Sequence, residues 1–167
     1  MSKPYFLIHW LTAALVFFNF GTGQYIPDLD FYSPWYHTLP RWHILSGLTM
    51  VLLTCVRLWR RPHQTFKHTA QSSLRWLAQL THRCLYGLLG VLFTTGYLMA
   101  TANGDGIIIY QDWTLPALTT LSAEASTEIG TLHGTVSLVL MACVSLHVLG
   151  ALKHYFFDKK ELTHVHT

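Results

Sequence analysis

The sequence predicts an all-α protein, an integral membrane four-helix bundle, from three observations. First, 51% of the 167 residues are hydrophobic and only 11% are charged, whereas an ordinary soluble domain is about 25% charged. Second, four long runs contain no charged side chain; they cover residues 5–26, 42–56, 84–104 and 129–152. Third, the eleven histidines equal all lysines and arginines together. The length suits one domain, residues 1–167.

Each run is long enough for a membrane span when its helix is extended to the nearest proline or charged residue. The first run stops at Pro27, the second is bracketed by Arg41 and Arg57, and a helical stretch from near Leu74 precedes the third. A bilayer core of about 30 Å needs about 20 helical residues. We therefore predict spans over residues 5–26, 41–60, 74–104 and 126–157. Strands are not expected, because an open sheet leaves backbone groups unpaired in lipid; the connection 101–128 has room for a short helix.

The loops carry opposite charge on the two sides of the membrane. Ten of the eleven basic residues fall on one side: Lys3, Arg57, Arg60, Arg61, Lys67, Arg75, Arg83, Lys153, Lys159 and Lys160. The other side has Arg41 and six acids, which are Asp28, Asp30, Asp105, Asp112, Glu124 and Glu128. The positive-inside rule therefore predicts that both termini are cytoplasmic. The modest net charge of +3 gives no reason to expect a nucleic-acid partner.

Four histidines lie inside the predicted spans, where ionisable groups are costly and usually functional. His133 and His147 are 14 residues or four turns apart, so they share one helix face about 21 Å apart. By depth, His9 matches His147 near the cytoplasmic side, and His43 matches His133 near the outer side. Two pairs at two depths suit two haems, each held between neutral imidazoles from facing helices. Small residues that could give a flat macrocycle clearance follow these positions: Ser46, Gly47, Gly134 and Gly150.

Two other interpretations of these histidines stay open from the residues alone. Each histidine could instead bridge two helices by a hydrogen bond. The protein could also be a membrane protein without haem, such as a metal transporter with histidine sites, although the four charge-free runs contain no Asp or Glu. The three cysteines form no C-x-x-C-H attachment motif, so any haem is expected to be held non-covalently.

Side chains at the cytoplasmic ends of the spans form a second group of candidates. His82 and His154 could contact haem propionates or a quinone headgroup, or they could be interfacial anchors. Arg57, Arg60 and Arg83 could neutralise propionates or stabilise a charged quinone, or they could act as topology signals alone. Arg41, on the outer side, is a further possible propionate or quinone contact. The remaining histidines are expected to be solvated; they are His37, His63, His68, His164 and His166.

Five short motifs occur in a fixed order along the four spans. They are I-H-W at 8–10, H-x-x-x-G at 43–47, V-R-L-x-x-R at 56–61, L-A-x-L-x-H at 77–82, and L-H at 146–147 followed by H-Y-F at 154–156. Each motif is short, but together they cover nearly the whole chain. In this order and spacing the chain resembles the bacterial cytochrome b561 family, whose best-defined members are superoxide oxidases.

The resemblance implies a di-haem b-type cytochrome that crosses the bacterial inner membrane several times. It implies that His9 and His147 are the axial ligands of the cytoplasmic-side haem iron, and that His43 and His133 are those of the outer haem iron. It also implies quinone chemistry, with ubiquinone or another quinone, near the histidines at the cytoplasmic ends of the third and fourth spans. The implied activity is that of a superoxide:quinone oxidoreductase.

The charge of the outer side departs from what superoxide would favour. Positive potential steers an anionic substrate, but the outer loops carry six acids and only Arg41, beside the candidate ligand His43. An acidic face suits a basic protein partner. The sequence therefore leaves open a second function, a cytochrome b subunit that serves a dehydrogenase or a soluble periplasmic cytochrome. In both cases the chain also contacts membrane lipid.

Overall fold

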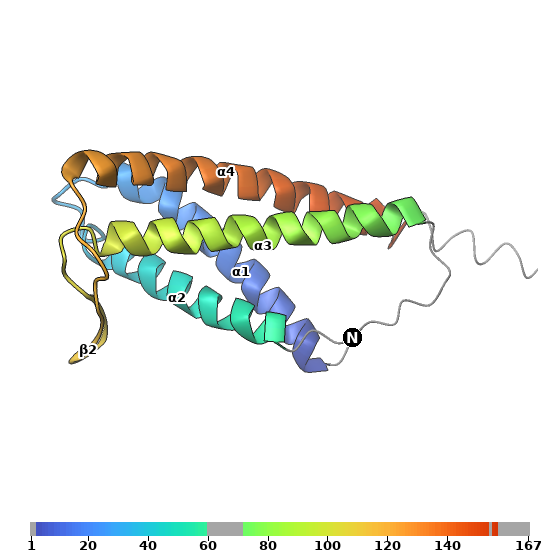
Figure 1. Cartoon of the computed structure of the whole chain (residues 1–167), viewed down its shortest axis with the longest axis horizontal. Coiled ribbons are helices and arrows are strands. Elements are labelled where there is room, and N and C mark those ends of the chain that lie inside the picture. The colour runs from blue at the N-terminus through green and yellow to red at the C-terminus, as the bar shows by residue number, and fades with distance from the viewer. Residues whose placement is uncertain (1–2, 60–71, 154, 157–167) are drawn as a thin grey trace, which may run out of the picture.

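The computed structural model describes residues 3–59, 72–153 and 155–156, which form a bundle of long helices (Figure 1). The long helices are α1 (Lys3–Tyr25), α2 (Thr38–Trp59), α3 (Ser72–Ala100) and α4 (Ala123–Lys153). A 3₁₀ turn, η1 (Ile26–Asp28), follows α1, and two strands, β1 (Ile107–Tyr110) and β2 (Trp113–Leu115), lie between α3 and α4. Each long helix has a stretch that is apolar and long enough to cross a membrane. The prediction of an integral membrane four-helix bundle is confirmed.

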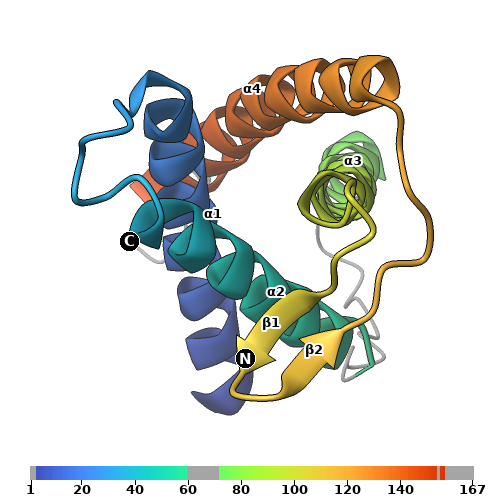
Figure 2. The same ribbon diagram turned by 90° about the vertical axis from the view of Figure 1, so that its left-hand side faces the viewer.

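The helices pack mainly as two helical hairpins, α1 against α2 and α3 against α4, which Figure 2 shows from one end. The α1–α2 connection and the β-strands lie at one end of the bundle, and the start of α1 and the end of α4 lie at the other (Figure 1). We call these the hairpin end and the termini end. When the bundle spans a bilayer, the two ends face opposite sides of it.

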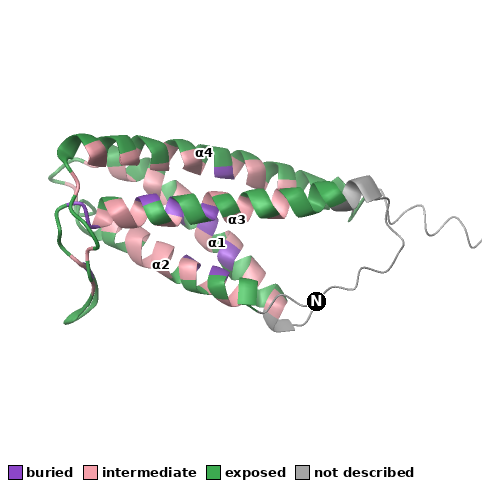
Figure 3. Cartoon of the chain, viewed as in Figure 1, coloured by how far each residue is buried: buried purple, intermediate pink, exposed green. Residues whose placement is uncertain are grey.

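The buried centre of the bundle is a layer of apolar side chains at mid-height, to which every long helix contributes. The layer consists of Val16, Met50, Leu89, Leu92 and Leu140. Outside this layer the helices carry both half-buried and exposed residues (Figure 3), and large apolar side chains such as Leu138, at 56% exposure, are among the exposed ones. Lipid tails are as apolar as leucine, so an exterior of this kind is stable in a bilayer.

A seven-residue step places further side chains above and below this central layer. Each long helix has one triplet of this kind: His9–Val16–Gly23, His43–Met50–Arg57, His82–Leu89–Gly96 and His133–Leu140–His147. Seven residues are about two helical turns, so each triplet lies on one face of its helix, as in other bundles with this packing. The inward faces therefore supply one layer at the hairpin end, one in the centre and one at the termini end.

Between α3 and α4 the chain forms an antiparallel β-hairpin, where the sequence predicted at most a short helix. Ile107 pairs with Leu115 and Tyr110 pairs with Trp113, and Gln111 at the turn has a φ of 46°. The argument against strands holds for backbone in lipid. It does not apply here, because this hairpin lies outside the spans, where water can satisfy its free edges.

The helix ends differ from the predicted spans by up to four residues, for local reasons. Helix α4 begins at Ala123 rather than at 126, because the hydroxyl of Ser122 accepts the amide of Ala125 at 3.2 Å and caps the first turn. Helix α3 ends at Ala100 rather than at 104, because the chain turns there and Gly104 has a φ of 85°. Glycine adopts this left-handed conformation without steric cost.

Candidate functional site

Two pairs of histidines face each other inside the bundle, one towards each end. At the termini end, His9 of α1 and His147 of α4 have ring centroids 6.5 Å apart and ring planes at 79°. At the hairpin end, His43 of α2 and His133 of α4 have centroids 6.3 Å apart and planes at 68°. The structure thus brings together the histidines that depth matching paired, and α4 contributes one histidine to each pair.

The ring separations fit a metal ion held between two imidazoles. A metal–nitrogen bond of about 2.0 Å and a ring radius of about 1.1 Å place the centroids of two opposed imidazoles about 6.2 Å apart. The residues present therefore fit the bis-histidine iron of a haem. In contrast, no three His, Cys, Asp or Glu side chains in the described part of the chain group closely enough to hold a metal ion.

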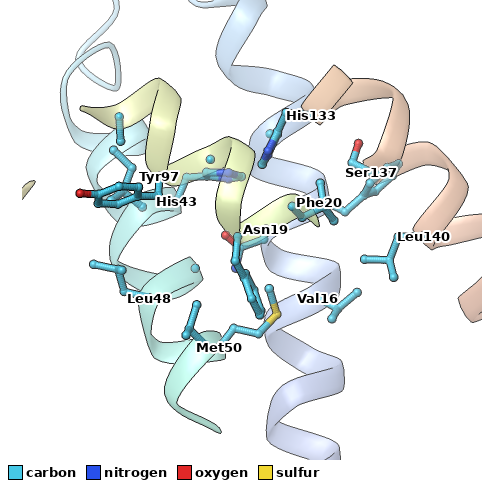
Figure 4. A pocket seen from close by; sticks show the side chains of 18 of the residues that line it. Val16, Asn19, Phe20, His43, Leu48, Met50, Tyr97, His133, Ser137 and Leu140 are labelled. Atoms are coloured by element: carbon cyan, nitrogen blue, oxygen red, sulfur yellow. The ribbon is translucent and has the colours of Figure 1, made fainter. Parts of the chain in front are cut away.

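The hairpin-end pair lines a cavity of about 150 Å³ between the helices (Figure 4). Each of its rings is held by a threonine of the preceding helix. The Nδ1 atom of His43 lies 2.9 Å from the hydroxyl of Thr22, and the Nδ1 atom of His133 lies 2.9 Å from the hydroxyl of Thr95. With Nδ1 engaged in this way, Nε2 is the nitrogen of each ring that remains for a ligand.

The termini-end pair lines a larger cavity, of about 450 Å³. This cavity is also lined by His82, whose ring centroid lies 5.1 Å from that of His147. The Nδ1 atom of His82 lies 2.7 Å from the carbonyl oxygen of Ala78. This end of the bundle therefore carries a third imidazole beside the facing pair.

Arg57 brings a positive charge to the same cavity. Its guanidinium carbon lies 5.8 Å from the ring centroids of both Tyr5 and Tyr86, which is within the range of cation–π attraction. Its Nε atom is buried and has no hydrogen-bond partner in the described part of the chain. Because buried donors normally have partners, this N–H can donate a hydrogen bond to an oxygen atom of a bound molecule, such as a carboxylate or a quinone carbonyl.

The sequence matches a known family along nearly its whole length. A profile described as "Prokaryotic cytochrome b561" matches residues 1–165. The chain belongs to this family. Among curated proteins, cytochrome b561 homolog 2 of Escherichia coli (strain K12) is 30% identical over 156 residues, which are 92% of this chain and 83% of that protein. The resemblance inferred from the sequence motifs is confirmed.

Membership of the prokaryotic cytochrome b561 family gives the protein its general role. The family transfers electrons in membranes, and its members generally bind haem b. The protein is therefore a multi-pass bacterial membrane protein that takes part in redox electron transfer. The two histidine-lined cavities are the places in its structure that fit such a cofactor.

The other candidate residues fall into three groups. Arg57 and His82 line the termini-end cavity. Arg83, on α3, is exposed, and so is Arg41, two residues before His43 at the hairpin end. His154 and Arg60 lie outside the described residues. Arg57 and His82 are thus the candidates that the structure places beside a histidine pair.

Four residues that contact the hairpin-end histidines were not candidates in the sequence. They are Thr22, Gly23, Thr95 and Gly96. A signal for them does exist, because the dipeptide Thr-Gly occurs twice in the chain, once in α1 and once in α3. The seven-residue step also places both glycines on the same helix faces as the central layer.

Proposed function

We propose that this protein is a di-haem cytochrome with one haem b between His9 and His147 and one between His43 and His133. In this proposal residues 1–167 form one transmembrane domain that passes electrons across the bacterial inner membrane. The supporting observation is the spacing of the two pairs, 6.5 and 6.3 Å between ring centroids, towards opposite ends of one bundle. Bound haem supplies one-electron redox chemistry at its iron.

The chain itself keeps the two sites apart and dry. Val16 and Leu140 line both cavities, and the central layer to which they belong fills the bundle at mid-height. The facing imidazoles occupy both sides of each site, so an iron held between them would have no open position at which oxygen could bind. The arrangement therefore suits outer-sphere electron exchange rather than oxygen binding.

The termini end is the better place for a quinone. It carries Arg57 and His82 in addition to the facing pair. The Nε–H of Arg57 can donate a hydrogen bond to a quinone oxygen or to a haem propionate. Basic residues of this end, among them Arg83 and Lys153, favour a cytoplasmic location for it and for both termini.

In this orientation the hairpin end faces the periplasm, and its charge bears on the electron donor. The acids there are all exposed; they are Asp28, Asp30, Asp105, Asp112, Glu124 and Glu128. Superoxide is the donor that the family resemblance suggests, but this surface repels anions. The acidic surface favours the second candidate, a basic partner such as a dehydrogenase or a soluble cytochrome.

The haem assignment is tested by counting haems spectroscopically. We expect two haems per chain in the wild type, and one in each of His9→Ala, His43→Ala, His133→Ala and His147→Ala, from reduced-minus-oxidised spectra of purified protein. Full haem retention in one of these variants would remove that histidine from the assignment. A wild type without a Soret band would reject the proposal as a whole.

The two donors are separated by a second experiment on the haem-loaded protein. Superoxide generated in solution should reduce added ubiquinone through the purified protein if superoxide is the donor. If a basic protein is the donor, superoxide has no effect, whereas a reduced basic cytochrome transfers electrons at a rate that falls steeply between low and physiological salt.

A further inference from the structure

The dipeptide Thr-Gly stands at residues 22–23 and 95–96 and nowhere else in the chain. One copy lies on α1 and the other on α3, the first helices of the two helical hairpins. The first copy contacts His43 on α2, and the second contacts His133 on α4. The same two-residue arrangement therefore serves both histidines of the hairpin-end pair.

The threonine of each copy contacts the Nδ1 nitrogen of its histidine and leaves Nε2 free. The Oγ1 atoms of Thr22 and Thr95 each lie 2.9 Å from Nδ1 of the facing ring. Each hydroxyl also donates to the carbonyl four residues earlier in its own helix, at 2.9 Å and 2.8 Å respectively. A hydroxyl has one proton and a carbonyl can only accept, so in the other contact the ring nitrogen is the donor. Nδ1 then carries the ring proton, and Nε2 keeps the lone pair that a metal ion needs.

The glycine of each copy gives the ring its place beside the neighbouring helix. A Cβ atom added to Gly23 would lie 3.1 Å from Cε1 of His43, and one added to Gly96 would lie 3.1 Å from Cε1 of His133. These distances are tighter than ordinary carbon–carbon contacts of about 3.5–4.0 Å. Gly90, on the same helix as Gly96, has nothing within 4 Å of such an atom. Among the glycines of the chain, Gly23 and Gly96 alone approach a histidine ring in this way.

The termini-end layer lacks this arrangement. Two seven-residue steps before Gly23 and Gly96, α1 and α3 carry His9 and His82. The Nδ1 atom of His9 is buried without a hydrogen-bond partner in the described residues. The threonine–glycine arrangement therefore belongs to the hairpin-end pair.

From these contacts we infer that Thr22–Gly23 and Thr95–Gly96 are positioning pairs, which hold His43 and His133 with Nε2 free and aimed at a ligand before the ligand binds. The inference rests on the proposed function, since it concerns the haem proposed between these two histidines. Partners that hold a metal-bound histidine by its second nitrogen typically change metal affinity or activity 10- to 100-fold when they are removed. We expect the same range for each threonine.

The first test measures haem affinity in a His147→Ala background, where the proposed function leaves only the hairpin-end haem. Haem is titrated into the full-length apoprotein in detergent. Thr95→Val and Thr22→Val are each expected to bind it about 10- to 100-fold more weakly, and Thr95→Ser, which keeps the hydroxyl, restores the affinity. Thr94→Val is the matched control, because Thr94 is exposed and its hydroxyl donates to the carbonyl of its own helix at 3.0 Å.

The second test reads the orientation of the ring directly. In the same background, the low-spin ferric EPR signal depends on the angle between the two axial imidazole planes. Thr95→Val and Gly96→Ala are expected to shift or broaden this signal, because the first releases the ring of His133 and the second displaces it. Thr94→Val and Gly90→Ala are expected to leave the signal unchanged.

The outcomes separate this inference from the proposal on which it rests. If the His147→Ala parent binds haem but Thr95→Val and Gly96→Ala match it in affinity and EPR signal, the positioning role is wrong and the di-haem proposal survives. If neither the wild type nor the parent binds haem, both are wrong. Circular dichroism and size exclusion identify a variant that does not fold, and Thr22→Val then decides the question from the other helical hairpin.

Discussion

Leu140 provides a test of the central layer, because it lies on the α4 face that also carries both facing histidines. It is 5% exposed and lies seven residues from His133 and seven from His147. Lipid solvates leucine as well as the protein interior does, so removing its side chain costs mainly the cavity left behind. The substitution Leu140→Ala empties roughly 75 Å³, which at about 24 cal/mol per Å³ lowers the free energy of unfolding by about 1.8 kcal/mol.

Thermal unfolding in one detergent, followed by helical circular dichroism, measures this loss. A decrease of about 1.8 kcal/mol corresponds to a Tm lower by about 4–7 °C for a chain of this size. Leu138→Ala is the matched control, since it removes the same atoms from a residue of α4 that is 56% exposed, and we expect a change within about 0.5 kcal/mol. If both variants lose the same stability, the central layer is not the packed region of the bundle.

Three further predictions concern the cavities and the loop. Arg57→Gln should raise the KM for quinone about 10- to 100-fold, because a hydrogen bond to a charged group contributes about 1.5–3 kcal/mol. Arg83→Gln, at an exposed arginine, should leave the KM unchanged. Equal increases of KM in the two variants would contradict a direct contact between Arg57 and the quinone. Ring planes at 79° and 68° predict strongly anisotropic low-spin EPR signals for both haems, and the rhombic signals of parallel imidazoles would refute this geometry. Gly104→Ala should lower the Tm, because it forces alanine into a left-handed conformation that costs about 1–2 kcal/mol and places Cβ 2.9 Å from the methyl group of Thr120. Gly87→Ala is the control, and a Gly104→Ala protein with the same Tm as this control would contradict the predicted strain.

The four spans and the facing histidines could be predicted because lipid restricts the sequence strongly. Charged side chains are excluded from the spans, so the charge-free runs mark the helices directly. The separation of 14 positions between His133 and His147 places them on one helix face without any knowledge of the neighbouring helices. His9 and His43 could then be matched by depth alone, because both lie close to an end of a span.

The contacts between helices could not be predicted in the same way. A threonine in a span usually bonds a carbonyl of its own helix, and only the rotation of α1 and α3 in the bundle shows that Thr22 and Thr95 also reach a histidine. Of the glycines chosen from sequence for clearance, Gly47 and Gly134 line the hairpin-end cavity, but Gly23 and Gly96, which lie against the histidine rings, were not among them. A glycine's neighbours belong to another helix, which its own sequence does not reveal.

The β-hairpin was missed for a different reason. The run Ile107–Tyr110 is rich in β-branched and aromatic residues, and Trp113–Leu115 follows after two polar residues, which is a recognisable hairpin pattern. The expectation of lipid around the whole chain obscured this pattern, although the strands lie in a loop, where the ordinary rules for water-exposed segments hold.

Helix α4 fixes the distance between the two histidine pairs. It supplies one histidine to each pair, so the distance of about 21 Å along its axis is set by the covalent chain and not by how the helices are tilted. Bilayers of different thickness change helix tilt at modest cost, but they cannot change this spacing. An insertion of one residue between His133 and His147 would turn one of them by about 100° away from its partner, since a helix has 3.6 residues per turn. Natural changes of length should therefore accumulate in the connections between helices and not in this part of α4.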